Sequence, residues 1–167
     1  FGTGDRFPPL SLVLDRQGIY YDAYVCSQLE SLLNSTEDVL LDQAQDVWRA
    51  RALLISNHLS KYNSAPFLAS SALRDDDVQR VLVIDQTAGD MSVALGGANA
   101  YTFAAMLAAA RAENPQATIY VKTHPEVTAG RKGGYLTQVQ DGVAASGQRT
   151  VVLRQAINPL SLIERMD

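Results

Sequence analysis

Polar residues with the potential for chemistry follow an apolar run near the middle of the chain. The segment VLVIDQTAGDMSV, residues 81–93, changes from aliphatic to polar after position 84. Its polar side chains are Asp85, Gln86, Thr87, Asp90 and Ser92. Carboxylates gathered at a strand end raise one another's proton affinity or need a cationic partner. Such a cluster is typical of a place that binds or transforms a ligand.

A second cluster, of opposite charge, follows the apolar run at residues 118–122. It contains Lys122, Thr123, His124 and Glu126. Ligands of open parallel sheets bind beyond the carboxyl ends of the strands. If the two strands are neighbours, both clusters face one crevice, with the carboxylates beside Lys122 and His124.

The elements that position these clusters alternate from residue 78 onward. Strands are predicted at 81–85, 118–122 and 149–154, with a helix at 100–114 and a last helix that Asn158 caps before Pro159. This spacing predicts right-handed crossovers and a parallel, Rossmann-like sheet, and therefore an α/β fold. Three strands are too few to complete such a sheet, so we expect part of a larger domain.

The upstream residues predict other elements. Residues 1–26 read as a β-hairpin, with strands at 10–14 and 19–21 and a turn in which Gly18 takes a positive φ. This hairpin would be the tail of a first Rossmann-like domain.

Residues 27–77 predict a helical connector and linker, which leaves 78–167 as the front half of a donor-binding domain. Ser27 can cap a short helix that ends near Asn34. Ser35 can cap a longer one at 36–59, whose apolar residues recur on one face and predict its burial. Residues 60–77 show no periodicity and are typical of a linker.

Composition excludes several classes of protein. With 47% hydrophobic and 19% charged residues and a net charge of -4, the chain can form a packed core and is unsuited to general nucleic-acid binding. A local excess of Lys and Arg after residue 118 suits a small anionic ligand. The single Cys26 rules out an intrachain disulfide, and no zinc spacing occurs, so we expect neither metal nor cofactor. No apolar run approaches the ~20 residues that span a bilayer.

Each candidate residue also has a purely structural explanation. Asp85 can cap a loop, and Asp90 can cap a helical turn through Ser92. Lys122 can be a solvated charge, and His124 can be a hydrogen-bonded turn residue before proline. The sequence GRKGG at 130–134 is interpreted as a flexible, solvated loop.

Comparison with known sequence motifs limits the reactions that these residues could catalyse. In the Asp-x-Asp-x-Thr pattern of aspartate-nucleophile phosphatases, Thr87 occupies the position of the second aspartate. The G-x-x-x-x-G-K-[ST] and G-x-S-x-G motifs are absent. What remains is a carboxylate nucleophile or base beside cations, which suits glycosyl transfer from an activated sugar. A phosphoryl-transfer enzyme using Asp85 and a non-catalytic scaffold stay open as alternatives.

Longer stretches resemble a known family. VLVIDQTAGDMSVALGGA and NPQATIYVKTHPEVTAGRKGGYL, with PPLSLVLDRQGIYYDA and LSKYN upstream, resemble the capsular polysaccharide biosynthesis family of retaining β-Kdo glycosyltransferases. The resemblance implies a two-domain, GT-B-like enzyme that uses CMP-Kdo and forms a covalent glycosyl–enzyme intermediate. It also implies a lipid-linked Kdo acceptor and a cytoplasmic location, with peripheral association with the inner membrane and with capsule assembly proteins.

The resemblance also implies roles for individual residues. Gln86 and Asp90 become catalytic, with Asp90 as the nucleophile. Lys122 and His124 are expected to hold the Kdo carboxylate or the CMP phosphate. Thr87 and Ser92 are expected to bind substrate. We expect residues 1–167 alone to be inactive, because further parts of the site would lie outside them.

Overall fold

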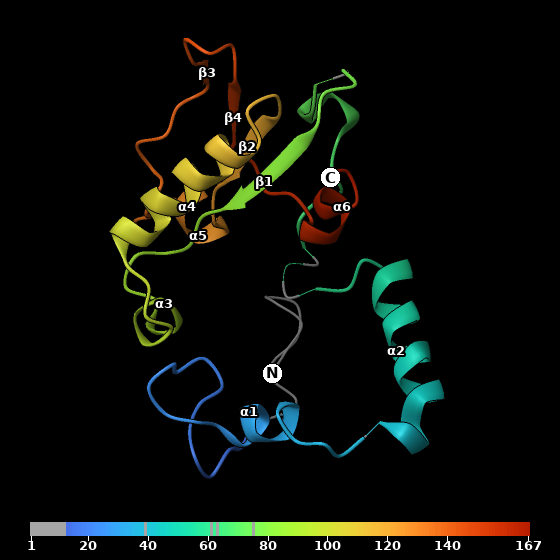
Figure 1. Cartoon of the computed structure of the whole chain (residues 1–167). Coiled ribbons are helices and arrows are strands. Elements are labelled where there is room, and N and C mark those ends of the chain that lie inside the picture. The colour runs from blue at the N-terminus through green and yellow to red at the C-terminus, as the bar shows by residue number, and fades with distance from the viewer. Residues whose placement is uncertain (1–12, 39, 61, 63, 75) are drawn as a thin grey trace.

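The protein is built around one small sheet (Figure 1). The computed structural model describes residues 13–167 except 39, 61, 63 and 75. The sheet has the strand order β1-β2-β4-β3, formed by β1 (Arg80–Ile84), β2 (Thr118–Lys122), β4 (Arg149–Leu153) and β3 (Gly142–Val143). β2 pairs in parallel with both β1 and β4, which confirms the α/β class and the mostly parallel sheet. The two-residue β3, antiparallel to β4, was not predicted.

The chain also forms six helices within the residues that the structure describes. They are α1 (Gln28–Leu33), α2 (Ala44–Ser56), α3 (Met91–Leu95), α4 (Ala100–Glu113), α5 (Pro125–Thr128) and α6 (Pro159–Ile163), with the 3-10 turns η2 (Leu41–Gln43) and η3 (Ser70–Ala72). α4 and α6 start where the sequence predicts, capped by Asn99 and Asn158. Within the described residues, no helix combines the length and the apolar character needed to cross a membrane.

The central strand β2 is buried on both faces of the sheet. Successive side chains of a strand point to opposite sides, so they pack in two different clusters. Ile119 and Val121 pack with Leu107 of α4 on one face. Tyr120 packs with Leu162 of α6 on the other. The sheet is therefore the middle layer between α4 and α6.

Residues 66–74 complete the layer around α6. The Leu68 amide donates to Ser161 Oγ at 3.0 Å, and the Arg74 amide donates to the Tyr120 hydroxyl at 3.1 Å. Leu68 and Leu73 pack against the same apolar cluster as α6. This part of the expected linker is irregular, as predicted, but it is fastened to the sheet. The division into domains at 26 and 77 stays a prediction.

The expected N-terminal hairpin is wrong where it can be examined. Residues 13–26 contain no strand, and Gly18 does not have a positive φ. The Asp15 carboxylate accepts hydrogen bonds from the amides of Gln17 and Gly18. The turn is therefore stabilised by a side chain and not by the backbone hydrogen bonds of a β-hairpin. The rest of the first expected strand, at 10–12, lies outside the described residues.

The helices at residues 27–59 agree in part with the prediction from the sequence. Ser27 caps α1 in a capping box with Glu30, and the helix ends at Asn34 as predicted. The next helix begins at Ala44, not at 36, because the Asp38 carboxylate accepts from the Leu40 amide and turns the chain first. The predicted burial of its apolar face is also wrong, since α2 buries none of its residues and stands apart from the sheet (Figure 1).

The cap of α6 provides a test of this packing. Asn158 Oδ1 accepts from the amides of Leu160 and Ser161, and its Nδ2 donates to the carbonyl of His58, in the turn that follows α2. Replacing Asn158 with Ala should lower the free energy of unfolding by about 2–3 kcal/mol, since a cap and buried hydrogen bonds are lost. Urea unfolding measures the change. Asn99→Ala, which removes an exposed cap of α4, should cost only about 1 kcal/mol; equal losses would contradict the interpretation.

Candidate active site

The pairing of β1 with β2 brings the two polar clusters together. Ile84 lies opposite Lys122, and the Asp85 amide donates to the Lys122 carbonyl at 2.9 Å. Both strands run in the same direction, so both polar segments leave the sheet at one edge. The predicted juxtaposition of the acidic and basic strand ends is confirmed.

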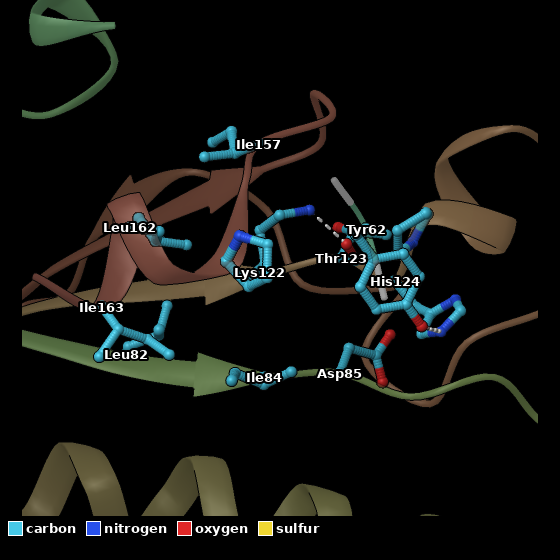
Figure 2. A pocket seen from close by; sticks show the side chains of 12 residues that line it. Tyr62, Leu82, Ile84, Asp85, Lys122, Thr123, His124, Ile157, Leu162 and Ile163 are labelled. Atoms are coloured by element: carbon cyan, nitrogen blue, oxygen red, sulfur yellow. Dashed lines mark hydrogen bonds between the residues drawn. The ribbon is translucent and has the colours of Figure 1, made fainter. Parts of the chain in front are cut away.

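A pocket of about 490 Å³, open mouth included, lies at this edge. Figure 2 shows Asp85, His124 and Tyr62 at one end, Lys122 between, and aliphatic side chains at the other end. The aliphatic lining consists of Leu82, Ile84, Ile157, Leu162 and Ile163. The pocket therefore joins a charged end to an apolar wall.

Lys122 is buried, with only 9% of its surface exposed, so its interpretation as a solvated charge is wrong. Its ammonium donates to the Thr123 carbonyl at 2.6 Å. Among the described residues no carboxylate lies within ion-pair distance of it. Burial lowers the pKa of the Lys122 amine, because the charged form loses hydration. An anion entering the pocket would stabilise that charge.

His124 caps α5 and is a hydrogen-bonded turn residue, as the structural alternative predicted. Its Nδ1 accepts from the Glu126 amide at 3.1 Å, and its Nε2 lies 3.1 Å from the Tyr62 hydroxyl. Because Nδ1 is an acceptor, the neutral ring carries its proton on Nε2. The N–H of His124 is thereby directed at Tyr62, at the rim of the pocket.

Asp85 is 2% exposed and acts through its hydrogen bonds. Its Oδ1 accepts from the Gln86 amide at 2.9 Å and from the Tyr135 amide at 3.0 Å. Gly134 lies so close to Oδ2 that a Cβ there would collide with it. The loop-capping interpretation of Asp85 is confirmed, and the loop that it holds comes from residues 130–135.

Residues 130–133 are exposed, as expected of a solvated loop, but backbone hydrogen bonds fasten this segment to its neighbours. The Ala88 amide donates to the Gly133 carbonyl at 2.8 Å, and Thr87 forms an antiparallel bridge with Gly134. The amides of Arg131 and Lys132 both donate to the Glu126 carbonyl, at 2.9 and 3.2 Å. Backbone hydrogen bonds thus join this segment to both strand ends.

Asp90 caps α3, as its structural alternative also predicted. Its Oδ1 accepts from Ser92 Oγ at 2.7 Å and from the Ser92 amide at 2.9 Å. These bonds lower the pKa of Asp90, and the positive charge of Lys132, with that of His124 when its ring is protonated, adds to the effect. No hydrogen bond joins Oδ2 to a described residue, which leaves that oxygen able to meet a ligand.

The structure therefore divides the predicted residues into groups. Asp85, Lys122 and His124 line one pocket, whereas Asp90, Gln86, Thr87 and Ser92 are not among its lining residues. Asp90 lies near enough to His124 for a protonated ring to lower the pKa of its carboxyl. Gln86 and Thr87 lie on the loop between the two carboxylates, where Gln86 Oε1 accepts from the Thr87 amide. Ser92 bonds to Asp90.

Three features of the site were missed from the sequence. Tyr62 contacts His124 from far along the chain, and no local pattern predicts such a contact. Lys132 acts on Asp90, and its only signal was the basic excess after residue 118. The close approach of Gly134 to Asp85 was signalled only by the glycine pair at 133–134.

The fold and the charged pocket define an α/β domain with a candidate ligand site at the carboxyl edge of its sheet. Residues 67–167 match the family described as "Capsule polysaccharide biosynthesis protein". The chain belongs to this family.

Similarity to individual proteins supports this family membership. The chain is 44% identical over 163 residues to the capsule polysaccharide modification protein LipA of Neisseria meningitidis serogroup B, covering 96% of this chain and 22% of LipA. It is 34% identical over 128 residues to the lipopolysaccharide-processing protein LpsZ of Rhizobium meliloti, covering 74% of this chain and 28% of LpsZ.

A solved structure confirms the fold. That protein, Thermosulfurimonas dismutans KpsC, is described as a beta Kdo 2,4 transferase. It matches with a TM-score of 0.82 and 43% identity over 99% of this chain and 50% of its own. The present chain thus spans half of the solved chain and about a quarter of the curated relatives.

Substitution of Gly134 tests the contact with Asp85. Gly134→Ala should lower the free energy of unfolding by about 1–3 kcal/mol, since the new methyl group displaces the carboxylate or the loop. The matched control is Gly133→Ala, whose Cβ would meet nothing closer than Ala88 Cβ at 3.8 Å. Urea unfolding compares the two. A Gly134→Ala protein as stable as the control would contradict the close packing.

Ser92 provides a test of the Asp90 carboxylate. Ser92→Ala should raise the pKa of Asp90, because the strongest hydrogen bond that favours its charged form is removed. A carboxyl whose folded pKa is lowered stabilises the fold above its unfolded pKa, and this stability is lost as pH falls through the folded pKa. Carboxyl NMR titration measures the shift, with Ser146→Ala on the β3–β4 turn as control. An unchanged pKa of Asp90 would show that Ser92 is not the cause.

Proposed function

We propose that this chain forms the donor-binding part of a retaining glycosyltransferase. The enzyme would move Kdo from CMP-Kdo to a lipid-linked acceptor in capsular polysaccharide biosynthesis. The observation that carries the proposal is the shared pocket of Asp85, Lys122 and His124 in a chain 43% identical to a solved β-Kdo transferase.

In the proposed reaction Asp90 is the nucleophile. Its Oδ2 attacks the anomeric carbon of Kdo, a carbon–oxygen bond to the enzyme forms, and CMP leaves with the electron pair of the broken bond. An acceptor hydroxyl then attacks the same carbon, loses its proton and releases Asp90. Two inversions give overall retention. The hydrogen bonds of Ser92 to Oδ1 support this role because they fix the orientation of the carboxylate and leave Oδ2 accessible to the sugar.

The cations would stabilise the negative charges of the donor. We expect the buried Lys122 ammonium to bind a phosphate or carboxylate oxygen, which lowers the barrier by neutralising charge on the departing CMP. His124 Nε2 carries an N–H, and we expect a donor oxygen to replace the Tyr62 hydroxyl as its acceptor. Gln86 would assist Asp90, while Thr87 and Ser92 fix the loop on which the donor lies.

The acceptor side is expected to come from outside residues 1–167. The solved transferase is twice as long as its matched region, so it contains residues that could form a second domain. A two-domain, GT-B-like arrangement with this chain on the donor side is part of the same proposal. A cytoplasmic location and peripheral contact with the inner membrane and capsule assembly proteins belong to the same proposal.

Trapping of the intermediate tests the proposal. The full-length protein carrying this sequence is incubated with CMP-Kdo and analysed by intact mass and peptide mapping. A Kdo adduct on the peptide that contains Asp90 is expected, and Asp90→Ala should abolish it and lower kcat at least about a thousandfold.

The control is Asp46→Asn, which removes an exposed carboxylate from α2 and should keep full turnover. Full turnover by Asp90→Ala would exclude Asp90 as the nucleophile. Loss of activity in Asp85→Asn with Asp90 dispensable would favour the phosphoryl-transfer alternative instead.

A further inference from the structure

Two adjacent cations, Arg131 and Lys132, lie in the loop at residues 130–134, and the proposed reaction uses neither. The Arg131 guanidinium binds the Glu126 carboxylate through two hydrogen bonds of 2.9 and 2.6 Å. Lys132 has no carboxylate within ion-pair distance among the described residues. Arg131 therefore neutralises a protein charge, while the charge of Lys132 is available to a ligand.

The backbone places Lys132 between the two strand-end segments. The Lys132 amide donates to the Glu126 carbonyl at the start of α5, at 3.2 Å. The next residue, Gly133, accepts from Ala88 in the acidic loop, at 2.8 Å. The side chain at position 132 thus starts between α5 and the acidic loop that follows β1. Its charge lowers the pKa of both Asp90 and Glu126, which agrees with this place.

The loop is anchored from its C-terminal side as well. The Tyr135 amide donates to the buried Asp85 carboxylate at 3.0 Å. The Tyr135 ring stacks on Phe103 of α4, with centroids 4.5 Å apart and planes 13° from parallel. Gly134 allows this approach, since it packs against Asp85 Oδ2 where a larger residue would collide. A lysine on a loop anchored at both ends loses less freedom when it binds.

We infer that Lys132 is a further anion-binding residue of this crevice and that Asp85 is the positioning residue that holds its loop there. The inference rests on the proposed function, and it names the chemistry recognised at the mouth: a phosphate or a carboxylate oxygen of the ligand. Lys122 would then meet the anion from the buried end of the pocket and Lys132 from the open end.

The effect of Lys132 should be modest because an exposed charge is screened by water and salt. We expect Lys132→Ala to weaken binding of the anionic ligand about 3- to 10-fold at low salt, with the difference shrinking as salt is raised. Lys132→Arg should restore most of the affinity because it keeps the charge. Arg49→Ala is the matched control, since it removes an exposed cation from α2.

Isothermal titration of the full-length protein with cytidine, CMP and CMP-Kdo separates the sources of the anion. Weaker binding of both CMP and CMP-Kdo assigns the contact to phosphate, and weaker binding of CMP-Kdo alone assigns it to the sugar carboxylate. Cytidine, which lacks both groups, should bind the variant and the wild type equally. Unchanged affinity of Lys132→Ala for both anionic ligands overturns the inference and leaves the proposed function standing. A wild-type protein that binds neither CMP nor CMP-Kdo overturns both.

A double-mutant cycle tests the part played by Asp85. If Asp85 acts by holding the loop, Lys132→Ala should cost less in an Asp85→Ala background than in the wild type. Gly134→Ala serves as a second background that displaces the same tether without removing a charge. The same fold-loss from Lys132→Ala in all three backgrounds would show that the tether does not position Lys132. Near-ultraviolet circular dichroism confirms that each background is folded.

Discussion

A buried carboxylate organises this site. Asp85 stands at the end of β1 with almost no exposed surface, where an ionised group without hydrogen bonds is strongly destabilising. Its Oδ1 is satisfied by the amides of Gln86 and Tyr135, one from its own loop and one fifty residues later in the chain. The need to satisfy this single group therefore brings a distant loop against the strand end. That contact fixes the loop at residues 130–135 to the end of β1.

The parallel pairing of β1 with β2 adds the opposite charge. The ladder places Lys122 opposite Ile84, one residue before Asp85. The Lys122 ammonium donates to a carbonyl, and no carboxylate of the described residues pairs with it. The surrounding walls are aliphatic, and in such surroundings electrostatic interactions are stronger than in water. A cation that the protein itself does not neutralise, placed in a partly apolar pocket, is suited to a negatively charged ligand.

The capping roles of Asp90 and His124 do not compete with roles in binding. A cap uses one atom of a side chain and fixes its orientation, as Ser92 does with Oδ1 of Asp90 and the Glu126 amide does with Nδ1 of His124. The other oxygen or nitrogen then has a defined direction. The structural and the functional explanations of these residues are therefore compatible, and the short helices α3 and α5 supply the rigidity.

Local patterns determined much of this protein without the structure. The strands at 118–122 and 149–153 (predicted to end at 154), the caps Ser27 and Asn158, and the shared edge of two charged strand ends follow from neighbouring residues and from the geometry of parallel sheets. The tertiary structure decided the rest. Hydrogen bonds to the side chain of Asp15 take the place of a predicted hairpin turn, and those to Asp38 delay the start of a predicted helix. The apolar stripe of α2 predicts a helix, but it does not show which surface, if any, the helix packs against. The docking of residues 130–135 on Asp85 and of Tyr62 on His124 joins segments far apart in the chain, and periodicity carries no information about contacts at that range.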